Sequence, residues 1–277
     1  MTIGELFPDL SLTPFAMVFS RNFLLNCGQN LSQIVGFALE HPLRDRVNLV
    51  RVENLLPRGL VSYQEADRIQ RDTWAQVRDG ELDHTLILGQ FEPTYTAGRN
   101  THDSDLINKD LPIIRTDRAG SLTWHGPGQL VIYPVVRLRE PVDLIAYIRA
   151  VEGAVIDAVH DTWDLDVEIV KGRAGVWLRY RDAAGRTATE RGTGRDRKLC
   201  AIGLKVVQNA TLHGLALNIH PDFNRAFTGI IPCGLNDAGV TSLFEEGIET
   251  DFDTAAKVVV DQLTVKLTPL LAPFSEI

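Results

Sequence analysis

The hydrophobic and polar positions of the chain first show a clear period after residue 60, and this period predicts a helix. Apolar residues recur every three or four positions from Ala66 to Val77, and Gly80 supplies a residue type that ends helices. Ser62 and Glu65 stand where a capping box has them, with each side chain satisfying a backbone N–H of the first turn. We therefore expect a helix that begins after Ser62 and ends at Gly80.

The same kind of pattern predicts two further helices and several strands. Residues 143–163 place apolar side chains on one side of a helix, and a C-terminal helix begins within residues 250–253. Residues 92–99 are rich in turn-forming residues and are expected to form a loop. Short apolar runs bounded by turn residues predict strands. These runs comprise residues 85–88, 112–115, 129–136, 166–170, 175–180, 199–207 and 211–219.

The order of these elements favours the α+β (α/β) class, with a mixed β-sheet flanked by helices. The elements do not alternate regularly as β-α-β units do, and no internal repeat or linker is visible. We therefore expect a single domain over residues 51–277. Residues 1–50 show no clear period, because residues such as Pro8 and Pro14 interrupt their short apolar pieces. We expect a loosely packed N-terminal extension there.

Composition narrows the classes of function. The 277 residues are 44% hydrophobic and 23% charged, as in a soluble globular protein, and the net charge of -8 argues against nucleic-acid binding. No apolar run approaches the roughly 20 residues that a membrane span needs, so we expect no membrane partner. The three cysteines, Cys27, Cys200 and Cys233, are widely spaced and odd in number, which favours a reducing cytoplasm over a disulfide framework. No CxxC or HExxH spacing is present, and we expect no metal site.

Cys233 is the residue best suited to carry covalent chemistry. It stands between Pro232 and Gly234, which favour a tight turn, and a base or positive charge would lower the thiol pKa from about 8.5 to make a nucleophile. Lys198 borders an apolar strand, where partial desolvation would lower its pKa and let the amine accept a proton. The alternatives are a buried structural cysteine and an ordinary surface lysine.

Two histidines compete with Lys198 for the role of base, because histidine titrates nearest to neutral pH. His125 and His213 each precede a glycine, so each is equally suited to a structural role. Residues 214–216 are small and would suit the wall of an apolar ligand pocket, although ordinary strand packing explains them as well. No nucleotide-binding loop of the GxxxxGK[ST] or GxGxxG type is found in the sequence.

Four stretches of sequence occur in order and together resemble one family. They are RAGSLTWHGPGQLVIYP at residues 118–134, KLCAIG at 198–203, TLHGLALN at 211–218, and PCG at 232–234 followed by VTSL at 240–243. This set resembles the lipoyl(octanoyl) transferases of lipoate biosynthesis, and the resemblance extends over about residues 55–243. It implies the α/β catalytic fold that these enzymes share with biotin and lipoate protein ligases.

The resemblance also implies a two-step transfer through a cysteine–lysine dyad, with Cys233 and Lys198 at the matching positions. Lys198 would take the thiol proton, and Cys233 would attack octanoyl-acyl carrier protein to form an acyl-enzyme. The acceptors would be lysines of apo lipoyl domains in 2-oxoacid dehydrogenase E2 subunits and in the glycine cleavage H protein, with no cofactor of the enzyme's own. The residues implied to surround the acyl group are Arg118, Ala119, Gly120, Ser121, Leu122, Thr123, Trp124, His125, Ala201, Ile202, Gly203, Gly214, Leu215 and Ala216, with His213 in a supporting role.

Two features depart from the family pattern. Ala119 stands where the family usually has the first of two glycines, which costs on the order of 1 kcal/mol if that position has a positive φ. The polar segment of residues 181–198 is longer than usual and holds six basic against three acidic residues.

Three alternative functions remain open at the level of sequence. An ATP-dependent lipoate–protein ligase has the same fold and needs no nucleophilic cysteine. A non-catalytic acyl-binding protein needs neither member of the dyad. A cysteine hydrolase is less favoured, because no Asn or Asp is clearly placed to orient His125 or His213.

The positive charge of residues 181–198 leads to a first prediction. We expect this segment to steer acidic carrier proteins or lipoyl domains toward the enzyme. Changing Arg191, Arg195 and Arg197 together to Glu should then raise KM for carrier-bound substrate in steady-state kinetics at low salt. An unchanged KM under these conditions would contradict the steering role.

Overall fold

The computed structural model describes residues 50–181, 195–231 and 238–273. All of these residues lie in one compact unit that extends from Asn48 to Ile277. The expected N-terminal extension lies almost entirely outside the described residues and stays a prediction.

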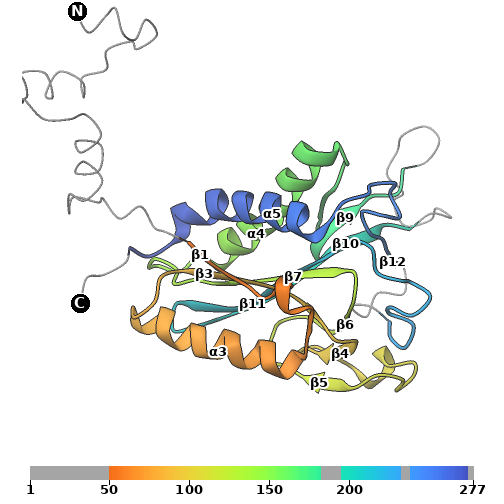
Figure 1. Ribbon diagram of the computed structural model, residues 1–277, viewed down its shortest axis with the longest axis horizontal. Coiled ribbons are helices and arrows are strands. Elements are labelled where there is room, and N and C mark those ends of the chain that lie inside the picture. Colours follow the sequence, from red (N-terminus) through yellow and green to blue (C-terminus); the bar gives the residue numbers. More distant parts are fainter. Residues whose placement is uncertain (1–49, 182–194, 232–237, 274–277) are drawn as a thin grey trace, which may run out of the picture. The chain divides into compact units, whose positions relative to one another are not determined.

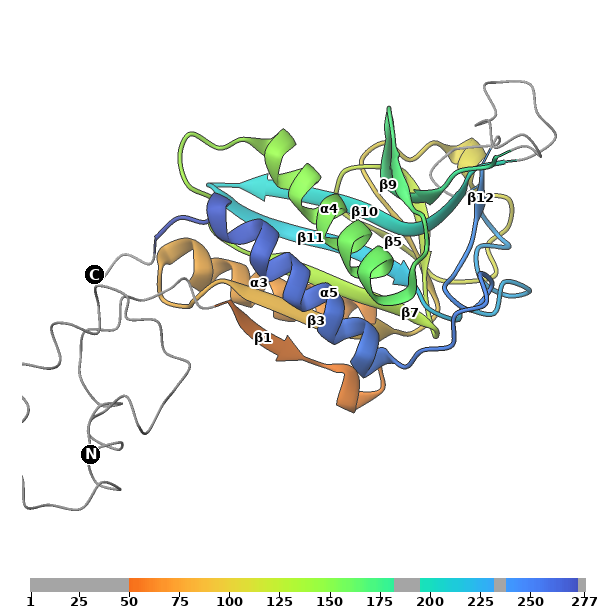
Figure 2. The ribbon, with the colours of Figure 1, turned by 90° about the horizontal axis from the view of Figure 1, so that it is seen from above.

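A mixed sheet of nine described strands forms the centre of this unit (Figures 1 and 2). Most neighbouring strands are antiparallel, but β1 and β2 pair parallel with β3, and β12 pairs parallel with β10, so the predicted mixed sheet is confirmed. The main path has the order β1 (Arg51–Asn54), β3 (Thr85–Phe91), β7 (Gln129–Val135), β11 (Ala210–Asn218), β10 (Arg197–Val207), β9 (Arg173–Leu178) and β8 (Glu168–Val170), with β2 (Leu60–Val61) joined to β3 and β12 (Gly239–Val240) joined to β10.

A second, three-stranded sheet has the order β5 (Ile113–Arg115), β4 (Thr94–Ala97) and β6 (Leu122–His125). Strand β4 lies within residues 92–99, where the sequence predicts a loop, and that prediction is wrong. Tyr95 explains the difference, because its ring is fully buried and its hydroxyl donates to Asp110 while accepting from the Gly229 N–H. Tertiary packing therefore outweighs the turn residues on either side of this strand.

Within the described residues, three α-helices cover the central sheet, with α3 (Tyr63–Asp79) on one face and α4 (Leu144–Trp163) and α5 (Phe252–Leu267) on the other (Figure 1). Each helix begins with a side-chain cap: Ser62, Asp143 and Asp251 accept a hydrogen bond from the backbone N–H three residues later. No described helix is long and apolar enough to cross a membrane.

The predicted capping box at the start of α3 is half present. The Ser62 Oγ accepts from the Glu65 N–H at 3.3 Å, but the Glu65 carboxylate pairs with the guanidinium of Arg58. Gly80 ends the helix with a φ of 78°, as expected for a residue in the left-handed region.

The two faces of the sheet carry different cores because side chains of a strand alternate between its faces. On β7, Leu130 and Ile132 pack in the core that includes α4 and α5, whereas Val131 and Tyr133 pack in the core that includes α3. Helix α3 also buries Gln70 completely, although an amide is costly to bury without hydrogen-bond partners. This buried amide points to a polar site between α3 and the sheet.

The cap of α3 gives a prediction about stability. Ser62→Ala removes the acceptor for the Glu65 N–H and should lower the free energy of unfolding by about 1 kcal/mol, measured by urea denaturation. Ser62→Thr keeps a capping hydroxyl and serves as the control. Equal destabilisation by both variants would show that the hydroxyl is not the cause.

Candidate active site

A pocket of about 330 Å³ lies between α3, strand β6 and the central sheet. This volume falls at the lower end of the roughly 300–1,000 Å³ that is typical of small-molecule sites. Its lining residues are Tyr63, Asn100, Arg118, Gly120, Ser121, Thr123, His125, Tyr133, Gly172, Arg173, Ala174, Lys198, Ala201, Ile202, Gly203, His213, Gly214, Leu215 and Ala216.

The floor of the pocket is made of small residues on two paired strands. In the register of β10 with β11, Ala201 lies opposite Ala216 and Gly203 lies opposite Gly214. A side chain at Gly214 would collide with the carbonyl oxygen of Ile132 on β7. A Cβ at Gly203 would lie 3.0 Å from the Ala119 carbonyl oxygen. Both glycines therefore allow neighbouring backbone to approach closely, and the two alanines leave space beneath α3 that larger side chains would fill.

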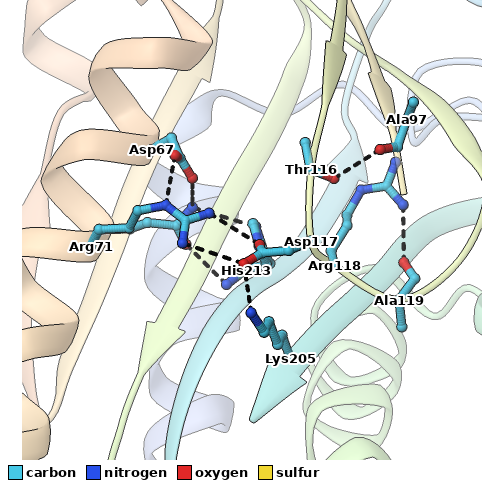
Figure 3. Close-up of polar contacts among 10 residues, drawn as sticks. Asp67, Arg71, Ala97, Thr116, Asp117, Arg118, Ala119, Lys205 and His213 are labelled. Atoms are coloured by element: carbon cyan, nitrogen blue, oxygen red, sulfur yellow. Dashed lines mark hydrogen bonds and ion pairs between the residues drawn. The ribbon is translucent and has the colours of Figure 1, made fainter. Parts of the chain in front are cut away.

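Arg118 forms one wall of the pocket and is almost fully buried. Its guanidinium donates to the Thr96 carbonyl oxygen at 2.6 Å. It also donates to the Ala119 carbonyl oxygen at 3.0 Å (Figure 3). Ala119 does not have a positive φ, whereas Gly120 does, at 87°. The alanine is therefore tolerated at this position without backbone strain, and the expected cost does not arise.

An ion-pair network centred on Asp117 fixes the chain just before Arg118 (Figure 3). The Asp117 carboxylate accepts from Arg71 at 3.0 Å, from Lys205 at 2.6 Å and from His213 Nε2 at 2.7 Å. Partial burial opposes ionisation of Asp117, but the hydrogen bonds from its three partners outweigh this effect and hold its pKa well below the usual range. The network ties together α3, β10, β11 and the loop that carries Arg118.

His213 is held by two partners and has an unusual backbone, with a φ of 61°. Its Nε2 meets Asp117, and its Nδ1 lies 3.4 Å from the amide nitrogen of Gln70, whose oxygen accepts the His213 N–H at 2.9 Å. These contacts explain why Gln70 is buried on α3. Burial lowers the pKa of His213 even though Asp117 opposes that change. With both ring nitrogens engaged, His213 is suited to a structural role rather than to that of a base.

His125 is fixed by a chain of hydrogen bonds that crosses the sheet. Its Nδ1 lies 2.7 Å from Gln129 Oε1, Gln129 donates to Asn218 at 2.9 Å, and Asn218 donates to the Thr241 carbonyl oxygen at 2.9 Å. A proton therefore belongs on Nδ1. Burial lowers the pKa of His125 to about 4, so its ring is neutral near pH 7.

Lys198 lies at the start of β10 and is 7% exposed. Its Nζ is 4.5 Å from the centre of the Trp177 ring, a distance typical of a cation–π contact. Its main chain pairs with Val240 of β12, and its carbonyl oxygen accepts from the Thr241 N–H at 3.0 Å. Lys198 is thus a buried amine at the edge of the pocket rather than the surface lysine of the alternative interpretation.

Cys233 lies outside the described residues, and so does Cys27. The described neighbours of Cys233 are attached near the pocket: the Ile231 N–H donates to the Asp105 carbonyl oxygen at 2.7 Å, and β12 pairs with the start of β10. Cys200 is fully buried, and burial raises its thiol pKa to about 12. Cys200 is therefore a core residue, as expected from its place in a strand.

Three of the residues that the family resemblance places around the acyl group do not line the pocket. Leu122 and Trp124 point to the opposite side of β6 from Thr123 and His125, because side chains alternate along a strand. Both pack in the core of the small sheet, where Trp124 lies 5.2 Å from Phe227 between ring centres. Ala119 contributes its carbonyl oxygen to Arg118 instead of lining the pocket.

The structure adds pocket residues that the sequence analysis does not assign to the site. Tyr63, the first residue of α3, and Tyr133, in the middle of β7, close the pocket from two sides, and Arg173 and Ala174 border Lys198. Tyr133 lies inside the family stretch of residues 118–134. The alternation of side chains along a strand predicts only that Tyr133 shares a face with Val131 and Val135, which is the face toward α3. Its place beside the pocket depends on the three-dimensional pairing of β7 with β11.

The sequence is similar to those of known proteins over most of the chain. Residues 62–264 match the family model of the lipoyl protein ligase A/B catalytic domain. The chain is similar to the octanoyltransferase of Corynebacterium jeikeium, with 40% identity over 210 residues, covering 74% of this chain and 85% of that protein. It is also similar to the octanoyltransferase of Nocardia farcinica, with 43% identity over 197 residues, covering 71% of this chain and 73% of that protein.

A solved structure of a bi-partite lipoate protein ligase from Thermoplasma acidophilum shares the fold. Its TM-score is 0.57 at 13% identity, over 78% of this chain and 83% of that chain. The fold expected from the sequence, with the catalytic-domain architecture of lipoate protein ligases, is thereby confirmed.

The Asp117 network leads to a prediction about pH. The pKa of Asp117 is lower in the folded protein than its unfolded value of about 3.9, so its contribution to stability is present above that pH and is lost as pH falls below it. Asp117→Asn should lower the free energy of unfolding by about 1 kcal/mol at pH 7, and its difference from wild type should shrink below about pH 4. Urea denaturation across this pH range measures both effects.

Asp72→Asn is the matched control for Asp117→Asn. Asp72 pairs with Arg68 on the exposed side of α3, where an ion pair contributes little to stability. Equal losses of stability at pH 7 in the two variants would show that the Asp117 network contributes no more than an exposed ion pair.

Proposed function

We infer that this chain, which belongs to the lipoyl protein ligase A/B catalytic-domain family and within it to the octanoyltransferases, transfers octanoyl groups in protein lipoylation. The donor in this proposal is octanoyl-acyl carrier protein. The acceptor is the lysine of an apo lipoyl domain, in 2-oxoacid dehydrogenase E2 subunits or in the glycine cleavage H protein. The reaction needs no cofactor of the enzyme's own, since the phosphopantetheine belongs to the carrier protein.

The first step of the proposed mechanism forms an acyl-enzyme. Lys198 takes the thiol proton of Cys233, and the thiolate attacks the thioester carbonyl carbon of the donor. The tetrahedral intermediate then expels the phosphopantetheine sulfur, which takes the proton back from Lys198, and the octanoyl group remains on Cys233 as a thioester. A backbone N–H beside the attacked carbonyl would stabilise the oxyanion, typically by about 3 kcal/mol.

The second step releases the octanoyl group to the acceptor. The uncharged ε-amine of the acceptor lysine attacks the acyl-enzyme carbonyl, an amide bond forms and the bond to the Cys233 sulfur breaks. The proton lost by the amine passes through Lys198 to the thiolate, which restores the starting enzyme. Two such steps with a thioester between them replace one direct transfer, as covalent catalysis requires.

The observation that carries this proposal is the position of Lys198. Its side chain is buried at the edge of the pocket, and β12, which pairs with it, begins six residues after Cys233 in the sequence. Six residues of extended chain span at most about 20 Å, which sets an upper limit on the length of this connection. The hydrogen bond of Ile231 and the pairing of β12 with β10 are compatible with a contact between Cys233 and Lys198.

The other residues of the pocket suit an acyl chain. The small floor residues leave an apolar path, and His125 is neutral near pH 7, so it adds no charge beside the chain. A dyad with a free thiol is also suited to a reducing cytoplasm, where we place the reaction.

Mass spectrometry of the intact protein tests the dyad directly. After mixing with octanoyl-acyl carrier protein, the wild type should gain one octanoyl group that hydroxylamine removes, and an apo lipoyl domain should discharge it. Cys233→Ala should gain none, and Lys198→Ala should form the adduct at least 100-fold more slowly, the usual range for loss of a general base.

Cys200→Ala is the control, since Cys200 is a buried core thiol with a raised pKa and should not carry the acyl group. An adduct that persists in Cys233→Ala but disappears in Cys200→Ala would show that Cys200, and not Cys233, is the nucleophile. Full activity of Cys233→Ala with free lipoate and ATP would instead identify an ATP-dependent ligase.

A further inference from the structure

The pocket has a definite direction, which runs from Lys198 toward Tyr133. Lys198 and, further along β10, Ala201, Ile202 and Gly203 line the pocket. The Lys198 side chain extends along the strand, because a Cβ at Gly175 would lie 3.5 Å from Lys198 Cε and would also touch the Cys200 carbonyl oxygen. About 10 Å of strand therefore separates the amine end of Lys198 from Gly203. At Gly203 the path turns across the sheet, because Gly203 pairs with Gly214, and Tyr133 on β7 comes next. The lysine side chain occupies one end of this interval, and the small residues of the floor keep its middle open.

Two tyrosines close the end of the pocket opposite Lys198. A Cβ added at Gly214 would lie 3.0 Å from the Cα of Tyr133, so the small floor ends directly at the tyrosine. Tyr63, at the start of α3, lies above this end, and the two side chains interact through their hydroxyl groups. Both residues are only 4% exposed.

The ring packing around the two tyrosines holds them in place. Phe91 packs against both, with ring centres 5.9 Å from Tyr63 and 5.8 Å from Tyr133. His125 stacks on Tyr63, and His213, which Asp117 and Gln70 hold, meets Tyr133 edge to face. Burial raises the pKa of both phenols, so the closed end is uncharged at neutral pH.

We propose that Tyr63 and Tyr133 form a rigid end wall that sets the length of the acyl chain this enzyme accepts. This inference rests on the proposed acyl transfer, with the thioester near Lys198 and the chain extended over the small floor. A medium-length chain reaches the wall without moving it. A longer chain has to displace buried rings that pack against Phe91, His125 and His213, and close-packed interiors resist such displacement.

Hydrophobic pockets discriminate strongly against an extra methylene only where they cannot expand. Each methylene that such a wall admits or excludes changes kcat/KM by about 10-fold to 200-fold. Shortening either tyrosine should therefore move the optimum toward longer chains, while the carbonyl end near Lys198 stays unchanged.

The test compares octanoyl- and dodecanoyl-acyl carrier protein as donors for transfer to an apo lipoyl domain. In the wild type, kcat/KM for the dodecanoyl donor should be lower than for the octanoyl donor by at least about tenfold. Tyr63→Leu and Tyr133→Leu should each raise the ratio of dodecanoyl to octanoyl kcat/KM by about tenfold or more. Tyr63→Phe and Tyr133→Phe keep the shape of the wall and should keep the wild-type ratio.

Tyr147→Leu is the matched control. Tyr147 is also a fully buried tyrosine, but it lies on α4 in the other core and does not line the pocket. Its loss should lower stability to a similar extent without changing the ratio. A change of ratio in this variant equal to that in the wall variants would assign the effect to general loosening of the fold and overturn the inference.

The remaining outcomes separate this inference from the proposed function. A wild type that transfers both donors equally has no end wall, and this result overturns the inference even if the leucine variants do not fold. Folded leucine variants that transfer octanoyl groups with the wild-type ratio overturn it as well. If the wild type transfers no acyl group at all, the proposed function fails, and with it the premise of the wall.

Discussion

The pairing of β10 with β11 is the constraint on which the site depends. In this register, two alanines and two glycines face α3 as opposed pairs, Ala201 with Ala216 and Gly203 with Gly214. A shift by one residue would turn these positions to the face covered by α4 and α5, and larger side chains would fill the space beneath α3. The pocket is thus a consequence of strand register, with the helix, the small sheet and the Arg118 loop built around it.

Polar contacts fix the elements that surround this space. The Asp117 network joins α3, β10 and β11 to the loop before Arg118, and Gln70 holds the unusual backbone of His213. The cost of burying these groups is offset because each has hydrogen-bond partners. Such a network specifies one arrangement of the elements around the pocket more strictly than apolar packing alone.

Much of the fold could be predicted from the sequence, because the long helices and most strands have strong periods and side-chain caps. Strand β4 could not, since its four residues stand among turn formers. Tyr95 is held by Asp110 and Gly229, which lie 15 and 134 positions away in the sequence. The motifs indicated Arg118, Lys198 and His125 as neighbours of one pocket. The motifs also indicated Leu122 and Trp124 as neighbours of this pocket. The alternation of side chains along β6 instead directs these two into the core of the small sheet. Tyr63 carries no motif at all, and its place at the pocket follows only from the packing of α3.

In the proposed reaction, an acyl chain attached near Lys198 extends over the small residues of β10 and β11. A crystal structure of the acyl-enzyme, prepared with octanoyl-acyl carrier protein, tests it most directly. We expect a thioester on Cys233 beside Lys198 and a chain that passes Ala201 and Ala216 and ends at Tyr133. A chain that leaves the pocket toward solvent, or a thioester remote from Lys198, would contradict the account.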